Sequence, residues 1–469
     1  MRICMILEGS YPYVRGGVSS WTHGYIQAFP ECEFVLWVIG ADSESRGKFK
    51  YELPPNVVEV REVFLNDAFV MTNEKKKIPR FTAEEKDEFL NLLRFKDPDW
   101  PTIFESAARG SLDPTAFLTS ELFLNEINTL CETRYLYIPY SDLYHTMRSM
   151  LLPLLYLLVQ DIPYADIYHT AVTGYGGILG SIGAWKNKKP FVVTEHGIYS
   201  REREEEVIRA GWVKPHLKDL WIDLFAMFSR CAYIRAQRVT ALFGSAGQIQ
   251  GQLGCSAEKR RVIGNGIRTE VFGAIPRKEP DGTVDIGAVV RIAQIKDIKT
   301  MIYAFAELKN SVSDVRLHIL GDVDDEEYSD ECKRLTEYLG VSGIAFVGNV
   351  DVSKYMTKLD FSILTSISEG QPLALLESMA AGLPVVSTDV GACRELIEGG
   401  KGDNLGDCGI VCPPMDAESL ASAMKRLCLS PQLREKMGQI GKARTAAYYN
   451  YGKMVEAYKN LYAEVSGRW

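Results

Sequence analysis

Short apolar runs alternate with helix-like patterns along most of this chain, and this alternation limits the folds that it can adopt. Buried strands separated by helices are typical of parallel sheets wrapped by crossover helices. The sequence therefore predicts an α/β fold with doubly wound parallel sheets. The predicted strands are 3–7, 33–38, 57–63, 166–169, 191–194 and 238–242 in the first half, and 284–291, 315–320, 345–347, 361–364, 384–388 and 409–412 in the second.

Two segments interrupt the alternation and divide the chain. Residues 68–160 carry charged helical stretches and no clear strand, which indicates a helical insertion. Residues 274–283 are rich in turn formers and charges, as expected of an interdomain linker. We therefore predict a first domain over 1–275 with this insertion, a second domain over 276–445, and a C-terminal helix over 446–469 that packs back toward the first domain.

Composition excludes several classes of protein. Hydrophobic residues make up 46% and charged residues 24% of the 469 residues, as in globular proteins. The formal net charge of -8 repels polyanions, so nucleic-acid binding is disfavoured. The ten Cys residues show no C-x-x-C spacing, which indicates a reducing compartment and neither a zinc site nor a disulfide framework.

The apolar segments are too short to place the chain in a membrane. The apolar run at 150–159 is about half as long as a membrane span, and the apolar run at 1–7 is too short for a signal peptide. We expect a cytoplasmic protein that can associate peripherally with the inner membrane through a partner.

The most informative stretch lies between the predicted strands 361–364 and 384–388. A loop carries Glu369 and Gly370, and Pro372 suits the first position of a helix. The unpaired amides at this helix start, around Leu373 and Ala374, predict an anion site, because the helix dipole favours a phosphate there.

Glu369 and Glu377 lie eight residues apart across this predicted helix start. Both carboxylates can therefore flank one ligand. The alternative interpretation is two unrelated surface glutamates, and their placement across the helix start weakens it.

Two cations follow the first strand of the second domain. Arg291 lies at the strand terminus and Lys296 five residues further on, so both can converge on one anion. Alone, such a pair more often belongs to a solvated surface. Its position at a carboxyl strand end favours ligand binding.

Three further loops follow strands. Gly16 and Gly17 come after the first strand and let a backbone approach a ligand closely, although a plain turn would also use them. His196 follows the strand 191–194, where a catalytic and a structural role are equally compatible with the sequence. Asn265 precedes Gly266 at another strand end and could form only a turn.

Together these elements resemble the retaining glycosyltransferases of family 4, which have two facing Rossmann-like domains in the GT-B arrangement. The resemblance covers nearly the whole chain apart from 68–160. Two departures affect local geometry but remove no functional side chain: Val-Val-Arg291 stands where Val-Gly-Arg is usual, and Ile-Gly-Asn265 where Ile-Pro-Asn is common.

The resemblance implies that the second domain binds a UDP-sugar donor. By analogy, Arg291 and Lys296 hold the diphosphate, Glu377 binds the ribose hydroxyls and Glu369 contacts the donor sugar. The donor-binding set is completed by Gly17 beside the diphosphate, Val350 at the base, Gly370, and the amides of Leu373 and Ala374.

The resemblance also implies that the first domain binds the acceptor, a polysaccharide. His196 would lie beside the anomeric centre, with Gly16 and Asn265 on the acceptor side. The insertion at 68–160 lies outside the family core, which suggests a role in docking to a membrane-embedded synthase subunit; packing on the first domain is the alternative.

We expect no metal and no cofactor. Negative charge develops on the leaving group, and Arg291, Lys296 and a helix N-terminus can stabilise it without a cation. An Asp-x-Asp pair, Asp322 and Asp324, has the spacing of a metal site, but it lies in an acidic run that reads as a solvated loop opening a helix.

Three other functions remain compatible with parts of the sequence. Glycines at 174–180 with Glu195 loosely resemble a dinucleotide motif of an NAD-dependent oxidoreductase, although the third glycine is displaced by one residue. The fold could also serve a non-catalytic assembly subunit or a sugar-nucleotide epimerase. Side chains do not rank UDP-glucose, UDP-N-acetylglucosamine and UDP-N-acetylgalactosamine as donors.

Overall fold

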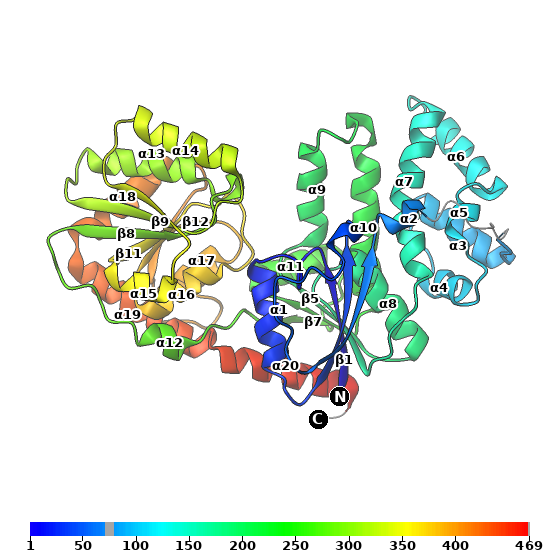
Figure 1. Cartoon of the computed structure of the whole chain (residues 1–469), viewed down its shortest axis with the longest axis horizontal. Coiled ribbons are helices and arrows are strands. Elements are labelled where there is room, and N and C mark those ends of the chain that lie inside the picture. The colour runs from blue at the N-terminus through cyan, green and yellow to red at the C-terminus, as the bar shows by residue number, and fades with distance from the viewer. Residues whose placement is uncertain (71–78, 468–469) are drawn as a thin grey trace. The chain divides into compact units, whose positions relative to one another are not determined.

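The structure, a computed structural model, describes residues 1–70 and 79–467 and divides them into two units (Figure 1). The first unit contains Met1–Ala241, Gly247–Val262 and the residues from Lys459 onward; the second contains Leu242–Ala246 and Ile263–Tyr458. Residues 263–275 and 446–458 thus lie in the second unit, whereas we drew the boundaries at 275 and 445. Residues 71–78 of the predicted insertion lie outside the described part.

The first unit is built on a parallel sheet with the strand order β3-β2-β1-β4-β5-β6-β7 among the described residues. The order reverses between β1 and β4, which defines a topological switch point where α/β proteins commonly bind ligands. The strands are β1 (Arg2–Glu8), β2 (Glu33–Gly40), β3 (Val57–Phe64), β4 (Ile167–Thr170), β5 (Phe191–Glu195), β6 (Arg238–Ala241) and β7 (Arg260–Val262).

Helices cover both faces of this sheet. Successive residues of a strand point to opposite faces. Accordingly, in β4 the Tyr168 ring faces Gly183 of α8, while His169 bonds to Tyr462 of the C-terminal helix α20 (Tyr451–Ser466). The other helices of this unit outside the insertion are α1 (Gly17–Gln27), α8 (Tyr175–Asn187), α9 (Tyr199–Arg209), α10 (Lys218–Arg235) and α11 (Gly244–Gln252).

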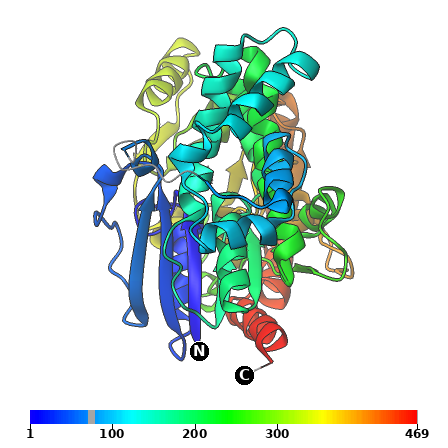
Figure 2. The same cartoon turned by 90° about the vertical axis from the view of Figure 1, so that its right-hand side faces the viewer.

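The insertion between β3 and β4 is helical, as predicted. Thr82 and Glu85 form a capping box that starts its second helix. Figure 2, in which the insertion faces the viewer, shows these helices in blue to cyan over the rest of the unit, and two of them, α4 and α7, contact α8. The helices are α2 (Asp67–Val70), α3 (Ala83–Leu93), α4 (Trp100–Ala108), α5 (Pro114–Phe117), α6 (Glu121–Thr133) and α7 (Tyr140–Leu158).

The apolar run at 150–159 is part of the hydrophobic core of the first unit. It forms the end of α7, where Met150, Leu154 and Leu155 are fully buried. Over 1–70 and 79–467, the structure contains no helix with the length and apolar character needed to cross a membrane.

The second unit repeats this architecture. Its parallel sheet has the order β10-β9-β8-β11-β12-β13 over the described residues, with the switch point between β8 and β11. The strands are β8 (Val284–Val289), β9 (Val315–Leu320), β10 (Ile344–Gly348), β11 (Phe361–Leu364), β12 (Val385–Thr388) and β13 (Gly409–Cys412).

Helix pairs pack together on this second sheet. Helix α13 contacts α18, and α16 contacts α19. Short α12 contacts α16 and α19, which explains why the residues before 275 cluster with the second unit. The helices are α12 (Thr269–Gly273), α13 (Ile298–Lys309), α14 (Glu326–Tyr338), α15 (Val352–Tyr355), α16 (Leu373–Ala381), α17 (Cys393–Glu398), α18 (Ala417–Leu429) and α19 (Pro431–Tyr448).

Candidate active site

An ion pair joins the two loops that flank the switch point of the second sheet. The Nζ of Lys296, after β8, lies 2.6 Å from Oε1 of Glu369, after β11, and the two side chains are only 17% and 11% exposed. The Ser366 hydroxyl donates to the same carboxylate oxygen at 2.5 Å. The hydroxyl of Thr365 donates to the carbonyl oxygen of Lys296 at 2.9 Å, so the backbones are joined as well. The structure therefore brings together two of the predicted site residues.

The start of α16 offers backbone donors beside this pair. Pro372 is the N-cap and provides no side-chain cap, so it precedes the helix, one position before the one we predicted. The amides of Leu373 and Ala374 bond to no acceptor within the described residues. A helix start of this kind favours an anion. Gly370, just upstream, accepts a hydrogen bond from the Ala392 amide, which holds the loop.

Glu377 lies on the same helix, and its own carboxyl group is unpaired within the described residues. No residue in the described part of the chain bonds to its side chain. Burial raises its pKa to about 7, because the charged form loses solvation. A buried carboxyl group without a protein partner is a candidate for binding ligand hydroxyls.

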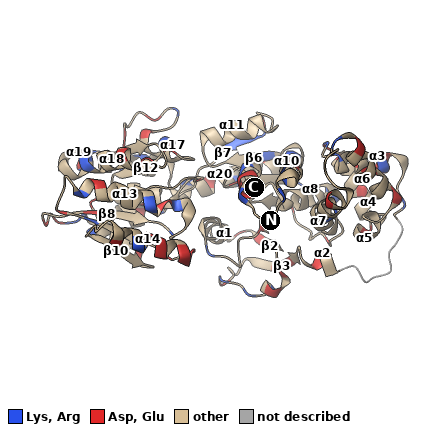
Figure 3. Cartoon of the chain, turned by 90° about the horizontal axis from the view of Figure 1, so that it is seen from above, with Lys and Arg blue, Asp and Glu red and all other residues tan. Residues whose placement is uncertain are grey.

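The side chain of Arg291 has a different partner from that of Lys296. Its guanidinium pairs with Asp324, and 53% of its side chain is exposed. Asp322 accepts a hydrogen bond from the Asn349 side chain at 3.1 Å. Both carboxylates of the Asp-x-Asp pair are therefore engaged by the protein, just before the acidic start of α14 (Figure 3).

A small cavity of about 220 Å³ lies at the carboxyl ends of β8, β9 and β10. Arg291, Asn349 and Val350 contribute to its lining, together with Gly321 and Asp322. Val350, predicted at the base of the donor, therefore lies in a hollow that also contains the predicted diphosphate residue Arg291.

Asn265 lies in the second unit, although we expected it on the acceptor side. Its amide nitrogen donates to Oε1 of Gln371 at 2.5 Å, and its side chain donates to the Gln371 carbonyl oxygen at 3.3 Å. It therefore supports the loop that leads to α16.

The remaining predicted residues lie at the carboxyl edge of the first sheet. Gly17 begins α1, and a Cβ atom at Gly16 or Gly17 would meet no atom within 4 Å. The ring of His196 packs edge-on against Trp21, with 4.5 Å between centroids. Burial lowers the pKa of His196 to about 4, so the ring is neutral at pH 7. Its Nε2 is buried, with no hydrogen-bond partner in the part of the chain described.

Sequence reasoning missed Glu8 at the same edge. Its carboxylate accepts hydrogen bonds from the Gly176 amide and the Tyr199 hydroxyl, each at 3.0 Å. Burial raises the pKa of Glu8. The only signal was an acidic residue at the end of a strongly apolar strand, which does not identify its distant partners.

The glycines of the weak dinucleotide motif allow α8 to pack closely on the sheet and on α10. A Cβ at Gly180 would collide with Phe191, and one at Gly177 would lie 2.8 Å from Cβ of Ala232. Glu195 is buried and accepts from Tyr233 and Gln250 at 2.7 and 3.0 Å, so it is engaged inside the unit.

Comparison with known proteins agrees with this architecture. The chain is 25% identical over 285 residues to the MMP alpha-(1->4)-mannosyltransferase of Mycolicibacterium hassiacum, covering 59% of this chain and 67% of that protein. HepE of Anabaena in complex with UDP has a TM-score of 0.62 at 15% identity and covers 99% of this chain and 100% of its own.

Two further solved structures have the same fold. HepE in complex with UDP-glucose has a TM-score of 0.59 at 14% identity, with coverages of 98% and 99%. Sucrose-phosphate synthase of Thermosynechococcus elongatus has a TM-score of 0.61 at 16% identity and covers 99% of this chain and 98% of its own. The expected GT-B fold, with two Rossmann-like parallel sheets, is confirmed.

Two family descriptions match the sequence. Residues 1–258 match the domain of unknown function DUF3492, and residues 283–430 match the group 1 glycosyl transferases. The chain therefore belongs to the DUF3492 family, and its second unit carries the domain of the group 1 glycosyl transferases.

Proposed function

We propose that this protein is a retaining glycosyltransferase that moves a hexose or N-acetylhexosamine from a UDP-sugar to a growing exopolysaccharide in the cytoplasm. The observation that carries the proposal is the Lys296–Glu369 pair at the switch point, beside the unpaired amides of α16. A switch point combined with a helix start is suited to a nucleotide diphosphate. The structural similarity to HepE, solved with UDP and UDP-glucose, supports the choice of donor.

Each part of such a donor has a matching group in the second unit. The base enters the cavity beside Val350, and the diphosphate lies near Lys296, Arg291 and the amides of Leu373 and Ala374. The ribose hydroxyls donate to the Glu377 carboxylate. The sugar lies against Glu369, which Lys296 and Ser366 hold in position.

The proposed reaction requires no covalent enzyme intermediate. The acceptor hydroxyl oxygen forms a bond to the anomeric carbon as the bond from that carbon to the diphosphate oxygen breaks. The leaving phosphate takes the hydroxyl proton, and attack on the face of departure retains the configuration. Negative charge grows on the diphosphate, where Lys296, Arg291 and the helix start stabilise it without a metal ion.

We assign acceptor binding to the first unit. Gly16 leaves open space at the edge of the sheet. The Nε2 atom of the neutral His196, which has no hydrogen-bond partner among the described residues, can accept one hydrogen bond from a sugar hydroxyl or donate one to it. The segment around Gly16 and Gly17 resembles PelF, the glycosyltransferase of Pel exopolysaccharide synthesis. We therefore favour a Pel-type polysaccharide as the acceptor.

Release of UDP tests the proposal directly. Purified protein should release UDP from one of UDP-glucose, UDP-N-acetylglucosamine or UDP-N-acetylgalactosamine, and Lys296→Gln should abolish most of this release. Lys299→Gln is the matched control, since Lys299 is a lysine of α13 whose side chain is 39% exposed and pairs with Glu331. Release from none of these donors, with or without an oligosaccharide acceptor, would favour a non-catalytic assembly subunit.

Product analysis separates the remaining alternatives. Nuclear magnetic resonance of the product should show a new glycosidic bond with the anomeric configuration of the donor. An altered sugar still attached to UDP would instead indicate an epimerase, and an inverted linkage would contradict the retaining mechanism.

A further inference from the structure

A large cavity of the first unit lies at the amino edge of its sheet, opposite the carboxyl edge that carries Gly17 and His196. Its volume is about 1000 Å³, at the upper end of the range for small-molecule sites. Asp166, Phe191 and Gln237 line it where β4, β5 and β6 begin, and Val465 and Ser466 of α20 close one side. None of the roles proposed above uses this cavity.

The charges in this amino-edge pocket are unevenly paired. The carboxylate of Asp166 is engaged by the Arg2 amide at 3.0 Å and by Lys189 at 3.5 Å, and Glu31 pairs with Lys459 at 2.6 Å. Lys188 and Arg235, by contrast, have no carboxylate partner within the described residues. The two acidic groups of the lining are thus neutralised, whereas two of its cations are not.

Arg235 provides the strongest indication of a ligand. It lies in the last turn of α10, where the helix dipole favours a cation, so its location alone has a structural explanation. However, its Nε is buried without a hydrogen-bond acceptor in the described part of the chain. A buried donor is normally satisfied, so this one calls for an acceptor that the described residues do not provide.

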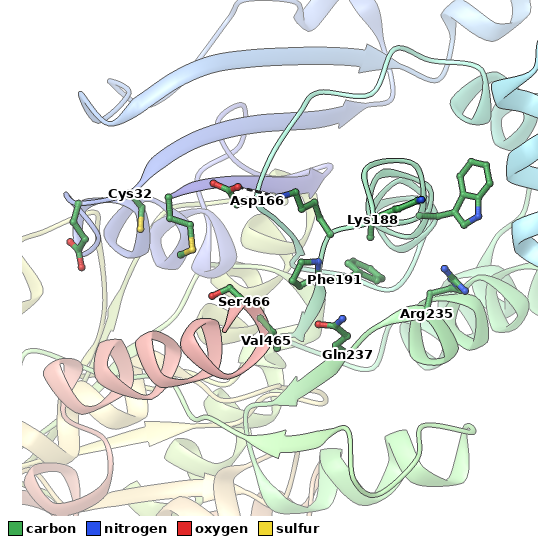
Figure 4. Close-up of a pocket in the computed structure, with 14 residues that line it drawn as sticks. Cys32, Asp166, Lys188, Phe191, Arg235, Gln237, Val465 and Ser466 are labelled. Carbon is green, nitrogen blue, oxygen red and sulfur yellow. Dashed lines mark hydrogen bonds and ion pairs between the residues drawn. The ribbon is translucent and has the colours of Figure 1, made fainter. Parts of the chain in front are cut away.

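The two cations line the same pocket. In Figure 4, Lys188 and Arg235 lie at one end of the pocket, Phe191 and Gln237 in the middle, and Cys32 at the other end. Trp185 and Pro190 are close to Lys188 in the sequence. Both add partly exposed, apolar surface to the lining of the pocket. An arginine fork and a lysine point charge suit a phosphate, and an aromatic wall suits a planar ring.

We propose that the amino-edge pocket binds a small organic phosphate, with its phosphate group between Lys188 and Arg235 and a planar ring against Trp185. The site lies entirely in the first unit, whereas the proposed donor residues Lys296, Glu369 and Glu377 lie in the second. Its occupant also contacts α20, the helix that contributes residues to both units. The pocket is therefore a second ligand site, separate from the donor site.

Calorimetric titration with phenyl phosphate tests this proposal, because this probe combines a ring with a phosphate. We expect saturable binding at one site and an affinity at least about tenfold lower in the Lys188→Gln/Arg235→Gln double variant. The Lys186→Gln/Arg209→Gln double variant removes the same charge from exposed positions outside the pocket and should bind like the unmodified protein. Lys296→Gln should also leave this binding unchanged, which separates the pocket from the donor site.

Three results would overturn the proposal. The first is the absence of saturable binding at millimolar phenyl phosphate. The second is an equal affinity of the two double variants for phenyl phosphate. The third is an affinity for inorganic phosphate, which has no ring, that equals the affinity for phenyl phosphate. If the double variant with Arg235→Gln fails to fold, as judged by circular dichroism, Lys188→Gln alone replaces it. Because Lys188 is exposed, its substitution leaves the core intact, and unchanged affinity in this variant would also contradict the proposal.

Discussion

Nζ of Lys296 lies 2.6 Å from Oε1 of Glu369, and this pair connects the loops after two neighbouring strands of the second sheet, β8 and β11. Both side chains are largely buried, so solvent screens the pair only weakly. The lysine fixes the carboxylate and keeps a cation at the switch point. The proposed sugar contact and the proposed phosphate contact are therefore coupled through one ion pair.

Glu369→Gln should mainly lower kcat. The proposed role of Glu369 is to stabilise positive charge on the sugar as the donor bond breaks, an interaction stronger in the transition state than in the ground state. Loss of a charge-assisted contact costs about 1.5–3 kcal/mol, which corresponds to roughly a ten- to hundred-fold lower kcat. Steady-state UDP release measures this effect, with Glu331→Gln as control, since the Glu331 side chain on α14 is 40% exposed. A glycosyl adduct on Glu369 in mass spectra would contradict the mechanism.

Glu377→Ala should instead raise the donor KM with little change in kcat, because a ribose contact is similar in the ground and transition states. Burial raises the pKa of Glu377 to about 7, so its stronger, ionised acceptor form appears as the pH rises from 6 to 8. The donor KM of the unmodified protein should fall over this pH range, whereas the donor KM of Glu377→Gln should not change with pH. Equal small effects on KM and kcat in the Glu369 and Glu377 variants would contradict the site.

The same pKa shift has a consequence for stability. Because the pKa is raised in the folded state, this carboxyl group stabilises the fold at pH values below its ordinary pKa near 4.5. This contribution is lost as the pH rises through about 7. The shift corresponds to about 3 kcal/mol at alkaline pH. Without ligand, Glu377→Gln should therefore unfold at a higher temperature than the unmodified protein at pH 8, and the difference should shrink at pH 5.

The sequence predicted the members of the site better than their partners. Lys296 and Glu369 were identified because each follows a strand, and carboxyl ends of parallel strands share one edge of a sheet. Ser366 and Gln371 were missed, since a hydroxyl or amide in a loop has no spacing signature. Asn265 was expected with the acceptor residues, but its bonds to Gln371 depend on a chain crossing that the local sequence does not specify.

The strands show a similar limit. Each predicted strand is present, with bounds that differ by at most two residues. Among the described strands, β7 (Arg260–Val262) was given no bounds, although Asn265 was placed at a strand end, because two arginines in a three-residue strand leave no apolar run. Apolar runs thus identify strands that contain them, including the edge strands β3, β10 and β13, and miss an edge strand that has no such run and pairs only with β6.

UDP release should be insensitive to EDTA. The proposed stabilisation of the leaving group uses Lys296, Arg291 and the α16 amides, while Asp322 and Asp324 are already engaged by Asn349 and Arg291. Activity measured after dialysis against EDTA, with and without added Mg²⁺ or Mn²⁺, checks this expectation. Loss of activity that either cation restores would instead assign a metal-binding role to the two aspartates.

The insertion should dock to a membrane-embedded synthase subunit through the connection between α6 and α7. Leu136 and Tyr137 are 63% and 97% exposed there. The Leu136→Ser/Tyr137→Ser double variant should lose co-sedimentation with membranes that contain the synthase and keep UDP release in solution. Tyr338→Ser, at an 87% exposed position of α14, is the control. Unchanged co-sedimentation of the double variant would show that the insertion surface is not the docking site.

Tyr462→Phe should destabilise the first unit. The Tyr462 hydroxyl lies 2.6 Å from Nδ1 of His169, and Nε2 of that ring lies 2.8 Å from Oγ1 of Thr194. Burial lowers the pKa of His169 to about 3, so the ring is neutral and has one N–H; with Tyr462 donating to Nδ1, that proton is on Nε2. Removing the hydroxyl leaves Nδ1 without this donor in a fully buried site.

The expected cost is about 1–3 kcal/mol, since a buried acceptor loses a hydrogen bond that water cannot replace. Urea denaturation followed by tryptophan fluorescence should show a lower midpoint for Tyr462→Phe. Tyr448→Phe, at a 52% exposed position of α19, removes the same hydroxyl group from a solvent-exposed side chain and should leave the midpoint unchanged. Because Tyr462 lies on the segment that returns to the first unit, equal midpoints for the two variants would show that this hydroxyl does not hold α20 on the sheet.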